Sequence, residues 1–147
     1  MENEKGRRIP RQRPGQTGGK RAQTLAQREA ELAQAGLSCF LTRGVSAVSI
    51  DEITKVAGLS KAAFYRYFEN KAGLVAHILS PVGEALTSSV SDCADTIRNA
   101  QTSDDVRTAY EDLAAALVSG ALSYPMEIQL YLQECRAPRD SDSAPIR

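Results

Sequence analysis

Residues 49–71 read SIDEITKVAGLSKAAFYRYFENK, a segment that predicts two short helices joined by a tight turn. Ser49 is followed three residues later by Glu52, which is the spacing of a capping box at the start of a helix. Gly58 stands where a left-handed residue commonly ends a helix, because glycine adopts that conformation without a steric penalty. Ser60 can then cap a second helix.

The apolar residues of this segment have helical spacing. The first helix carries a stripe formed by Ile50, Ile53, Val56 and Ala57. Phe64 and Phe68 lie four residues apart, so they share one face of the second helix and we expect both in the core. The remaining residues are left to face outward, and they are Ala62, Ala63, Tyr65, Arg66 and Tyr67.

These outward residues suit a helix-turn-helix whose second helix enters the major groove of DNA. Small side chains let the backbone approach base edges, tyrosine hydroxyls donate to phosphate, and arginine can bond guanine at two atoms. We expect the residues nearest to the bases to be Lys61, Ala62, Ala63 and Arg66. We expect the residues that hold or flank the phosphates to be Ser49, Ser60, Tyr65, Tyr67 and Lys71. Each signal alone also occurs in ordinary helical bundles, with the tyrosines half-buried and the charges solvated.

The combination GLSKAAFYRYFENKAGL, residues 58–74, closely resembles the recognition-helix signature of the tetracycline-repressor (TetR) family of bacterial transcriptional regulators. The preceding AGLSCFLTRGVSAVSIDEITKVAG, residues 35–58, is similar to that family's first helix, turn and second helix. The resemblance covers roughly residues 24–79 and is silent beyond them. It implies ligand control and dimerisation through a second helical domain, in which one long helix follows the DNA-binding part.

The charge of the chain is strongly polarised although it sums to zero. Residues 1–71 contain 13 Lys and Arg against 7 Asp and Glu, whereas residues 72–147 contain 5 against 11. A basic half attracts a polyanion and an acidic half is repelled by it, so this pattern orients the molecule on DNA. Part of the difference comes from residues 1–23, whose arginines either follow a DNA groove or only solubilise the chain.

The pattern of apolar residues predicts an all-α fold. We expect a disordered basic arm over residues 1–23, a DNA-binding domain over 24–71, an incomplete helical regulatory or dimerisation domain over 72–136, and a disordered tail over 137–147. The first helix should begin at Thr24, bury Leu25, and stop at Gly44. Asn70, Thr102 and Pro125 should each start a helix, and Gly120 should end one. Pro81 either interrupts the helix after Asn70 or opens a new one.

Enzymatic sites are not indicated, and we expect neither a catalytic activity nor a metal or cofactor. The single histidine, His77, has no triad or metal-ligand pattern around it, so we expect a structural role. The three cysteines Cys39, Cys93 and Cys135 lack disulfide or metal spacing, and we interpret them as buried small hydrophobic residues. No apolar run is long enough for a membrane span and no secretory signal is present, so we expect a cytoplasmic protein.

The leading hypothesis is therefore a sequence-specific, DNA-binding transcriptional regulator, a repressor released by a small-molecule effector. Its partner would be double-stranded operator DNA. A homodimer is expected to be weak, because the helices after residue 80 should leave little apolar surface to spare for a second copy. The alternative is a truncated regulator that acts as a protein-interaction module and forms heterodimers with a full-length relative.

Overall fold

Six helices make up the part of the chain that the computed structural model describes, residues 17–136, with side chains described from residue 23. They are α1 (Thr17–Arg43), α2 (Ile50–Ala57), α3 (Lys61–Phe64), α4 (Lys71–Asn99), α5 (Ser103–Ser123) and α6 (Pro125–Cys135). No strand occurs within these residues, and the expected all-α class is confirmed. Within the same range, no helix combines the length and the apolar character that crossing a membrane requires.

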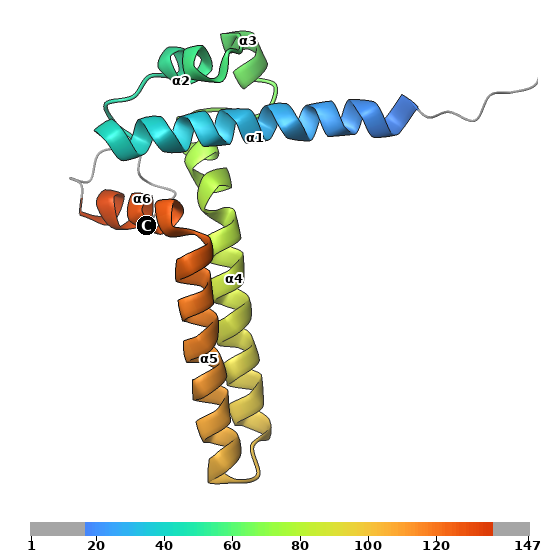
Figure 1. Cartoon of the computed structure of the whole chain (residues 1–147), viewed down its shortest axis with the longest axis vertical. Coiled ribbons are helices and arrows are strands. Elements are labelled where there is room, and N and C mark those ends of the chain that lie inside the picture. The colour runs from blue at the N-terminus through green and yellow to red at the C-terminus, as the bar shows by residue number, and fades with distance from the viewer. Residues whose placement is uncertain (1–16, 137–147) are drawn as a thin grey trace, which may run out of the picture.

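The helices form a small head and a long stalk (Figure 1). Helices α2 and α3 lie on one side of α1, and the antiparallel pair α4 and α5 extends away from its other side. Helix α6 returns from the end of α5 and packs against α1 and the beginning of α4. The last helix of the described chain therefore lies beside the first.

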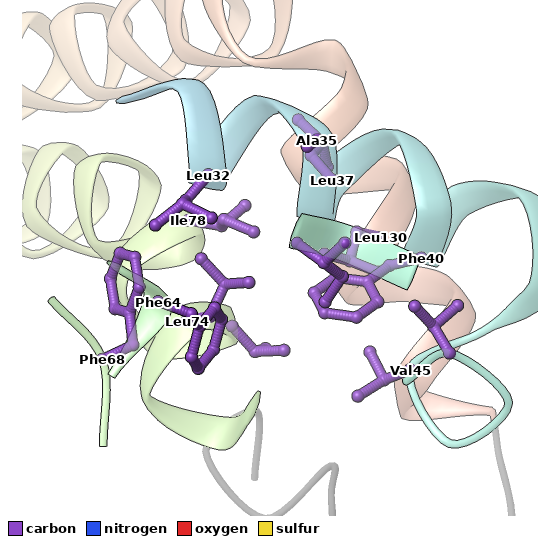
Figure 2. Packing of buried hydrophobic residues seen from close by; sticks show 13 residues of the cluster. Leu32, Ala35, Leu37, Phe40, Val45, Phe64, Phe68, Leu74, Ile78 and Leu130 are labelled. Atoms are coloured by element: carbon purple, nitrogen blue, oxygen red, sulfur yellow. The ribbon is translucent and has the colours of Figure 1, made fainter. Parts of the chain in front are cut away.

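The core of the molecule lies in the head, where buried side chains of α1, α2, α3, α4 and α6 meet (Figure 2). Its buried side chains are Leu32, Ala35, Leu37, Phe40, Val45, Val48, Ile53, Phe64, Phe68, Leu74, Val75, Ile78 and Leu130. The crossing of α1 and α4 is close at Gly36, because a Cβ atom there would lie 2.7 Å from Cδ2 of Leu74. A larger residue at position 36 would therefore have to displace Leu74.

The expected helix boundaries of the head are largely confirmed by their caps. The hydroxyl of Ser60 accepts a hydrogen bond from the backbone N–H of Ala63, and Asn70 caps α4 through the N–H of Gly73. Gly58 adopts the left-handed conformation with φ of 66° after α2, a region that favours glycine. In the stalk, Thr102 caps α5 and Pro125 occupies the first turn of α6. These helix-boundary signals depend only on residues that are close together in the sequence.

Helix α1 begins at Thr17 rather than at the expected Thr24. Lys20, Arg21, Ala22 and Gln23 are good helix formers, so nothing in the sequence stops the helix from extending backward from Thr24. Leu25 was expected to be buried but is exposed, because it lies two helical turns before Leu32, the first residue of α1 in the buried cluster. The disordered arm expected over residues 1–23 is helical from Thr17 onward. Its residues 1–16 and the tail expected over 137–147 fall outside the described residues.

Two expected breaks in the stalk are wrong. Helix α4 continues through Pro81, which sits at an exposed position within it, and packing on α5 keeps both sides helical despite the lost hydrogen bond. Helix α5 likewise continues through Gly120 and ends at Ser123. The stop comes before Tyr124 and Pro125, since proline disfavours helical geometry in the residue before it.

The stalk exposes far more apolar surface than the sequence predicted. Large apolar side chains that are exposed on α4, α5 and α6 are Leu86, Val90, Tyr110, Leu117, Val118, Leu122, Met126, Tyr131 and Leu132. The expectation that helix packing would leave little apolar surface is therefore wrong, because a two-helix stalk covers only one face of each helix. Cys135 is also exposed, against the expectation that all three cysteines are buried, while Cys93 is buried as expected.

Helix α6 is fastened to the head by the apolar side chain of Leu130 and by hydrogen bonds of Gln133 and Glu134. Leu130 is fully buried in the head's core. The amide Nε2 of Gln133 donates to the backbone oxygen of Phe40 at 3.2 Å. The carboxylate of Glu134, itself buried, accepts a hydrogen bond from the backbone N–H of Val45 at 3.0 Å. These contacts satisfy backbone groups at the end of α1 and in the connection that leads to α2.

The α2 stripe contains a matched pair of residues that tests where the core ends. Ile53 is fully buried, whereas Val56, which was expected on the same stripe, is 62% exposed. We expect Ile53→Ala to lower the free energy of unfolding by about 2–5 kcal/mol, the usual result for a buried aliphatic side chain. Val56→Ala should change it by no more than about 0.5 kcal/mol. Urea unfolding followed by circular dichroism measures both, and equal losses would contradict the placement of α2.

Candidate nucleic-acid interface

Helix α3 and the turn that follows it carry the residues expected to face outward, and buried aromatic rings anchor this segment to the core. It is a single α-helical turn, Lys61–Phe64, and residues 65–67 continue it as a hydrogen-bonded turn. The N–H groups of Tyr67 and Phe68 both donate to the carbonyl of Phe64, each at 3.0 Å. The rings of Phe64 and Phe68 are buried 5.6 Å apart (Figure 2), as their spacing predicted. Their burial fixes which side of the segment faces away from the core.

Six of the nine expected site residues are exposed, and the other three are half-buried. Exposed residues of the set are Ser49, Ser60, Lys61, Ala62, Tyr65 and Arg66. Ala63 and Lys71 are half-buried. Tyr67 was expected to face outward, but it is half-buried and packs against the core, because the chain turns toward α4 after Arg66. Fewer of the expected site residues are therefore fully exposed than the sequence predicted.

Lys61 is held by a residue that the sequence reading did not include in the site. Its ammonium lies 3.0 Å from Oδ1 and 3.1 Å from Oδ2 of Asp51, in the first turn of α2. The hydrogen bond and the charge of Asp51 raise the pKa of Lys61 above its ordinary value. This ion pair joins the two helices of the helix-turn-helix across their outer surface.

The start of α2 is fixed by a second charged group. Glu52 accepts hydrogen bonds from the backbone N–H and the hydroxyl of Ser49, both at 2.8 Å, and Arg43 of α1 lies 2.8 Å from its other oxygen. The N–H and hydroxyl of Ser49, followed by Arg43, lower the pKa of Glu52 to about 2. Ser49 therefore contributes to α2 as a cap, and Glu52 remains ionised throughout the neutral pH range.

Lys71 has a contact inside the head. Its ammonium donates to the backbone oxygen of Val48 at 2.9 Å, which ties the first residue of α4 to the segment that precedes α2. An ammonium group carries three donors, so this contact and a phosphate contact are compatible. Lys71 thus lies at the edge of the surface and also helps to fix the position of α2.

The sequence analysis did not single out Thr54, a further polar group near the site. Thr54 is buried and its hydroxyl donates to the backbone oxygen of Asp51 at 3.1 Å. His77 was expected to be structural, and its ring lies 5.3 Å from that of Phe68, with Nδ1 3.6 Å from a carboxylate oxygen of Glu29. Across residues 17–136, no group of three or more His, Cys, Asp and Glu side chains is placed to hold a metal ion.

The arrangement resembles a DNA reader in its chemistry. Cationic, hydroxyl and small side chains share one exposed surface, and the helix that presents them is anchored by buried aromatic rings. Residues 32–78 match the family model described as bacterial regulatory proteins, tetR family. The matched range spans most of the head, from the buried part of α1 to the beginning of α4.

Two curated proteins with similar sequences are described as transcriptional regulators. The transcriptional regulator AcuR of Cereibacter sphaeroides is 49% identical over 41 residues, which are 28% of this chain and 19% of that protein. An uncharacterised HTH-type transcriptional regulator of Bacillus subtilis strain 168, YuxN, is 28% identical over 115 residues, 78% of this chain. The matched part is only 37% of YuxN, so the chain spans well under half the length of these relatives.

One solved structure is similar, that of a protein described as a TetR-family transcriptional regulator from Mesorhizobium loti MAFF303099. It shares 22% identity with a TM-score of 0.48, over 76% of this chain and 55% of that one. The family assignment stands on the matched sequence of the head. The N-terminal part of the chain, residues 32–78, is thus a domain of the type described for bacterial regulatory proteins of the tetR family.

Proposed function

We propose that the chain binds double-stranded DNA in a sequence-specific manner and represses transcription where it binds. The observation that carries this proposal is the exposure of Lys61, Tyr65 and Arg66 on a segment whose opposite face is fixed by buried Phe64 and Phe68. A reader must present a fixed set of donors, because base edges are distinguished by the positions of their hydrogen-bonding groups. Such a protein works in the bacterial cytoplasm, where the chromosome lies.

The exposed residues divide into two roles. Arg66 and Lys61 offer donors to base edges, and the small side chains of Ala62 and Ala63 allow the backbone to come close. Tyr65 projects its hydroxyl from the same surface, since its ring stands edge-on against Phe64 with centroids 5.5 Å apart. The residues assigned to the phosphates or their flanks are Ser49, Ser60, Tyr65, Tyr67 and Lys71. Of this set, Tyr67 has the least support as a phosphate contact, because its side chain is partly buried against the core.

We further propose that a small apolar molecule releases the DNA. An open groove of about 580 Å³ lies between α4, α5 and α6. Fifteen residues line it, none of them charged, and they include Leu86, Leu117, Tyr131 and Leu132. The opposite side of α6 carries Leu130 and the two polar contacts to the head. A molecule that shifts α6 on filling the groove would therefore also disturb the head.

Assembly is proposed to be weak in solution and to occur mainly on DNA. The stalk exposes apolar side chains that two copies could share, but residues 72–147 carry 11 acidic and 5 basic residues, and like charges oppose pairing. Two half-sites on one duplex would bring two copies together. The same apolar surface also fits the alternative, a heterodimer with a longer relative.

Arg66 and Lys71 should differ in what their loss does to DNA binding. Arg66→Ala should flatten the base preference at one or two positions, because a bidentate contact to guanine contributes about 1–3 kcal/mol of discrimination. Lys71→Ala should weaken binding to all sequences alike and reduce the salt slope by about one unit. Binding-site selection and anisotropy titrations measure these effects. An unchanged selected motif for Arg66→Ala would show that this residue only positions the protein.

The groove can be tested with an uncharged apolar dye such as Nile red. We expect the dye to bind the full chain and to weaken its binding to DNA, because the groove is apolar and shares α6 with the head. Leu117→Arg should abolish dye binding, while Val118→Arg, a neighbour that is exposed but does not line the groove, should not. Equal dye binding by both variants, or unchanged DNA binding with dye present, would overturn the proposed control.

Self-association can be measured by analytical ultracentrifugation with and without a selected duplex. We expect the free chain to sediment as a monomer or a weakly associating dimer, and two copies to be present on a duplex with two half-sites. Raising the salt concentration should favour pairing of the free chain, since it screens the repulsion between acidic stalks. A stable dimer at submicromolar concentration without DNA would contradict the proposal.

A further inference from the structure

The first turn of α2 contains two adjacent carboxylates that are used differently. Glu52 belongs to the capping box and is held by the N–H and hydroxyl of Ser49. The carboxylate of Asp51 instead reaches across to α3 and pairs with the ammonium of Lys61 through both of its oxygens. Thr54 binds the backbone oxygen of Asp51 and not its side chain. The side chain of Asp51 is thus directed at one of the proposed base-reading residues.

Both members of this pair are accessible to DNA. The side chain of Lys61 is 53% exposed and that of Asp51 is 67% exposed. Lys61 is the first residue of α3, directly after the cap Ser60. A phosphate that approaches this position meets a cation that is already paired, and a carboxylate of its own sign beside it.

We propose that Asp51 is a specificity-determining residue, which holds Lys61 so that only a DNA site with well-placed acceptors gains from it. This inference rests on the proposed function. When the Lys61 ammonium moves from the Asp51 carboxylate to a phosphate of random DNA, it exchanges one anionic partner for another. The gain in binding free energy is therefore small. A guanine edge offers two acceptors in a fixed position, and only a base pair in register with α3 can present them. Asp51 therefore lowers binding to random DNA more than binding to the operator.

The salt dependence of binding reports this arrangement. Each protein cation that neutralises a phosphate releases condensed counterions and adds about 0.9 to the slope of log affinity against log salt on duplex DNA. Lys61 should add little to the slope of the parent chain on random DNA, because Asp51 already neutralises it. Replacing Asp51 by asparagine keeps the side chain's size, removes the charge and leaves Lys61 available to phosphate.

The test uses the full 147-residue chain, a random-sequence duplex and a duplex obtained by binding-site selection with the parent. Anisotropy titrations over about 50 to 200 mM salt cover the range in which such slopes are measured. Asp51→Asn should raise affinity for the random duplex about two- to fivefold at low salt, the scale of one surface ion pair. Its slope should steepen by up to about one unit, and its preference for the selected duplex should fall.

Two further variants separate this role from a general charge effect. Asp112→Asn removes the same charge from an exposed position in the middle of α5 and should leave both affinities within twofold of the parent's. In a Lys61→Ala background, Asp51→Asn should lose most of its effect, because Asp51 acts through Lys61. The inference is overturned if Asp51→Asn matches the parent, weakens binding to both duplexes, or acts equally without Lys61.

Failure of the proposed function looks different. If the parent itself shows no salt-dependent binding to either duplex, the proposal of DNA binding is rejected, and the proposed role of Asp51 is rejected with it. If the parent binds and prefers its selected duplex while Asp51→Asn behaves as the parent does, DNA binding stands and only the role of Asp51 is lost.

Discussion

The buried contact between Glu134 and the N–H of Val45 fastens the last described helix, α6, to the head. It joins α6 to the connection between α1 and α2, across 89 residues of sequence. Without an acceptor from α6, this N–H would remain buried and unpaired, which typically costs about 1–3 kcal/mol. Val45 and Val48 are both fully buried or nearly so, and they set how the chain enters α2. The position of α2 therefore depends on a helix that lies outside the helix-turn-helix.

This dependence links the proposed DNA surface to the stalk. Helix α6 has one side on the head, through Leu130, Gln133 and Glu134, and another on the apolar groove, through Tyr131 and Leu132. It is only eleven residues long, so a shift on one side moves the other as well. On the opposite edge of the head, Lys71 ties α4 to Val48. The connection before α2 is thus held from α4 and from α6, the two helices that also form walls of the groove.

Much of the head could be predicted because its signals are local. The capping box of Ser49 and Glu52, the left-handed Gly58 and the four-residue spacing of Phe64 and Phe68 each involve residues within one or two helical turns. The same spacing correctly placed Ala62, Tyr65 and Arg66 on the outside. These features depend on backbone geometry and on side-chain direction, which neighbouring residues determine.

The predictions were wrong where burial, helix continuity or a side chain's partner depends on residues that are distant in the sequence. Val56 belongs to the apolar stripe of α2 by spacing, but α1 covers only the side that carries Ile53. Gly120 and Pro81 are helix breakers by propensity, yet packing between α4 and α5 keeps both positions helical. The partners of Lys61 and Glu134 could not be read from spacing, since they lie 10 and 89 residues away.

The hydrogen-exchange rate of the Val45 amide tests most directly whether α6 sets the geometry of the head. In Glu134→Ala we expect this amide to exchange about tenfold faster or more than in the parent, while Glu134→Gln, which keeps an acceptor oxygen, should stay close to the parent. An unchanged exchange rate at Val45 in Glu134→Ala would contradict the dependence of the head on α6.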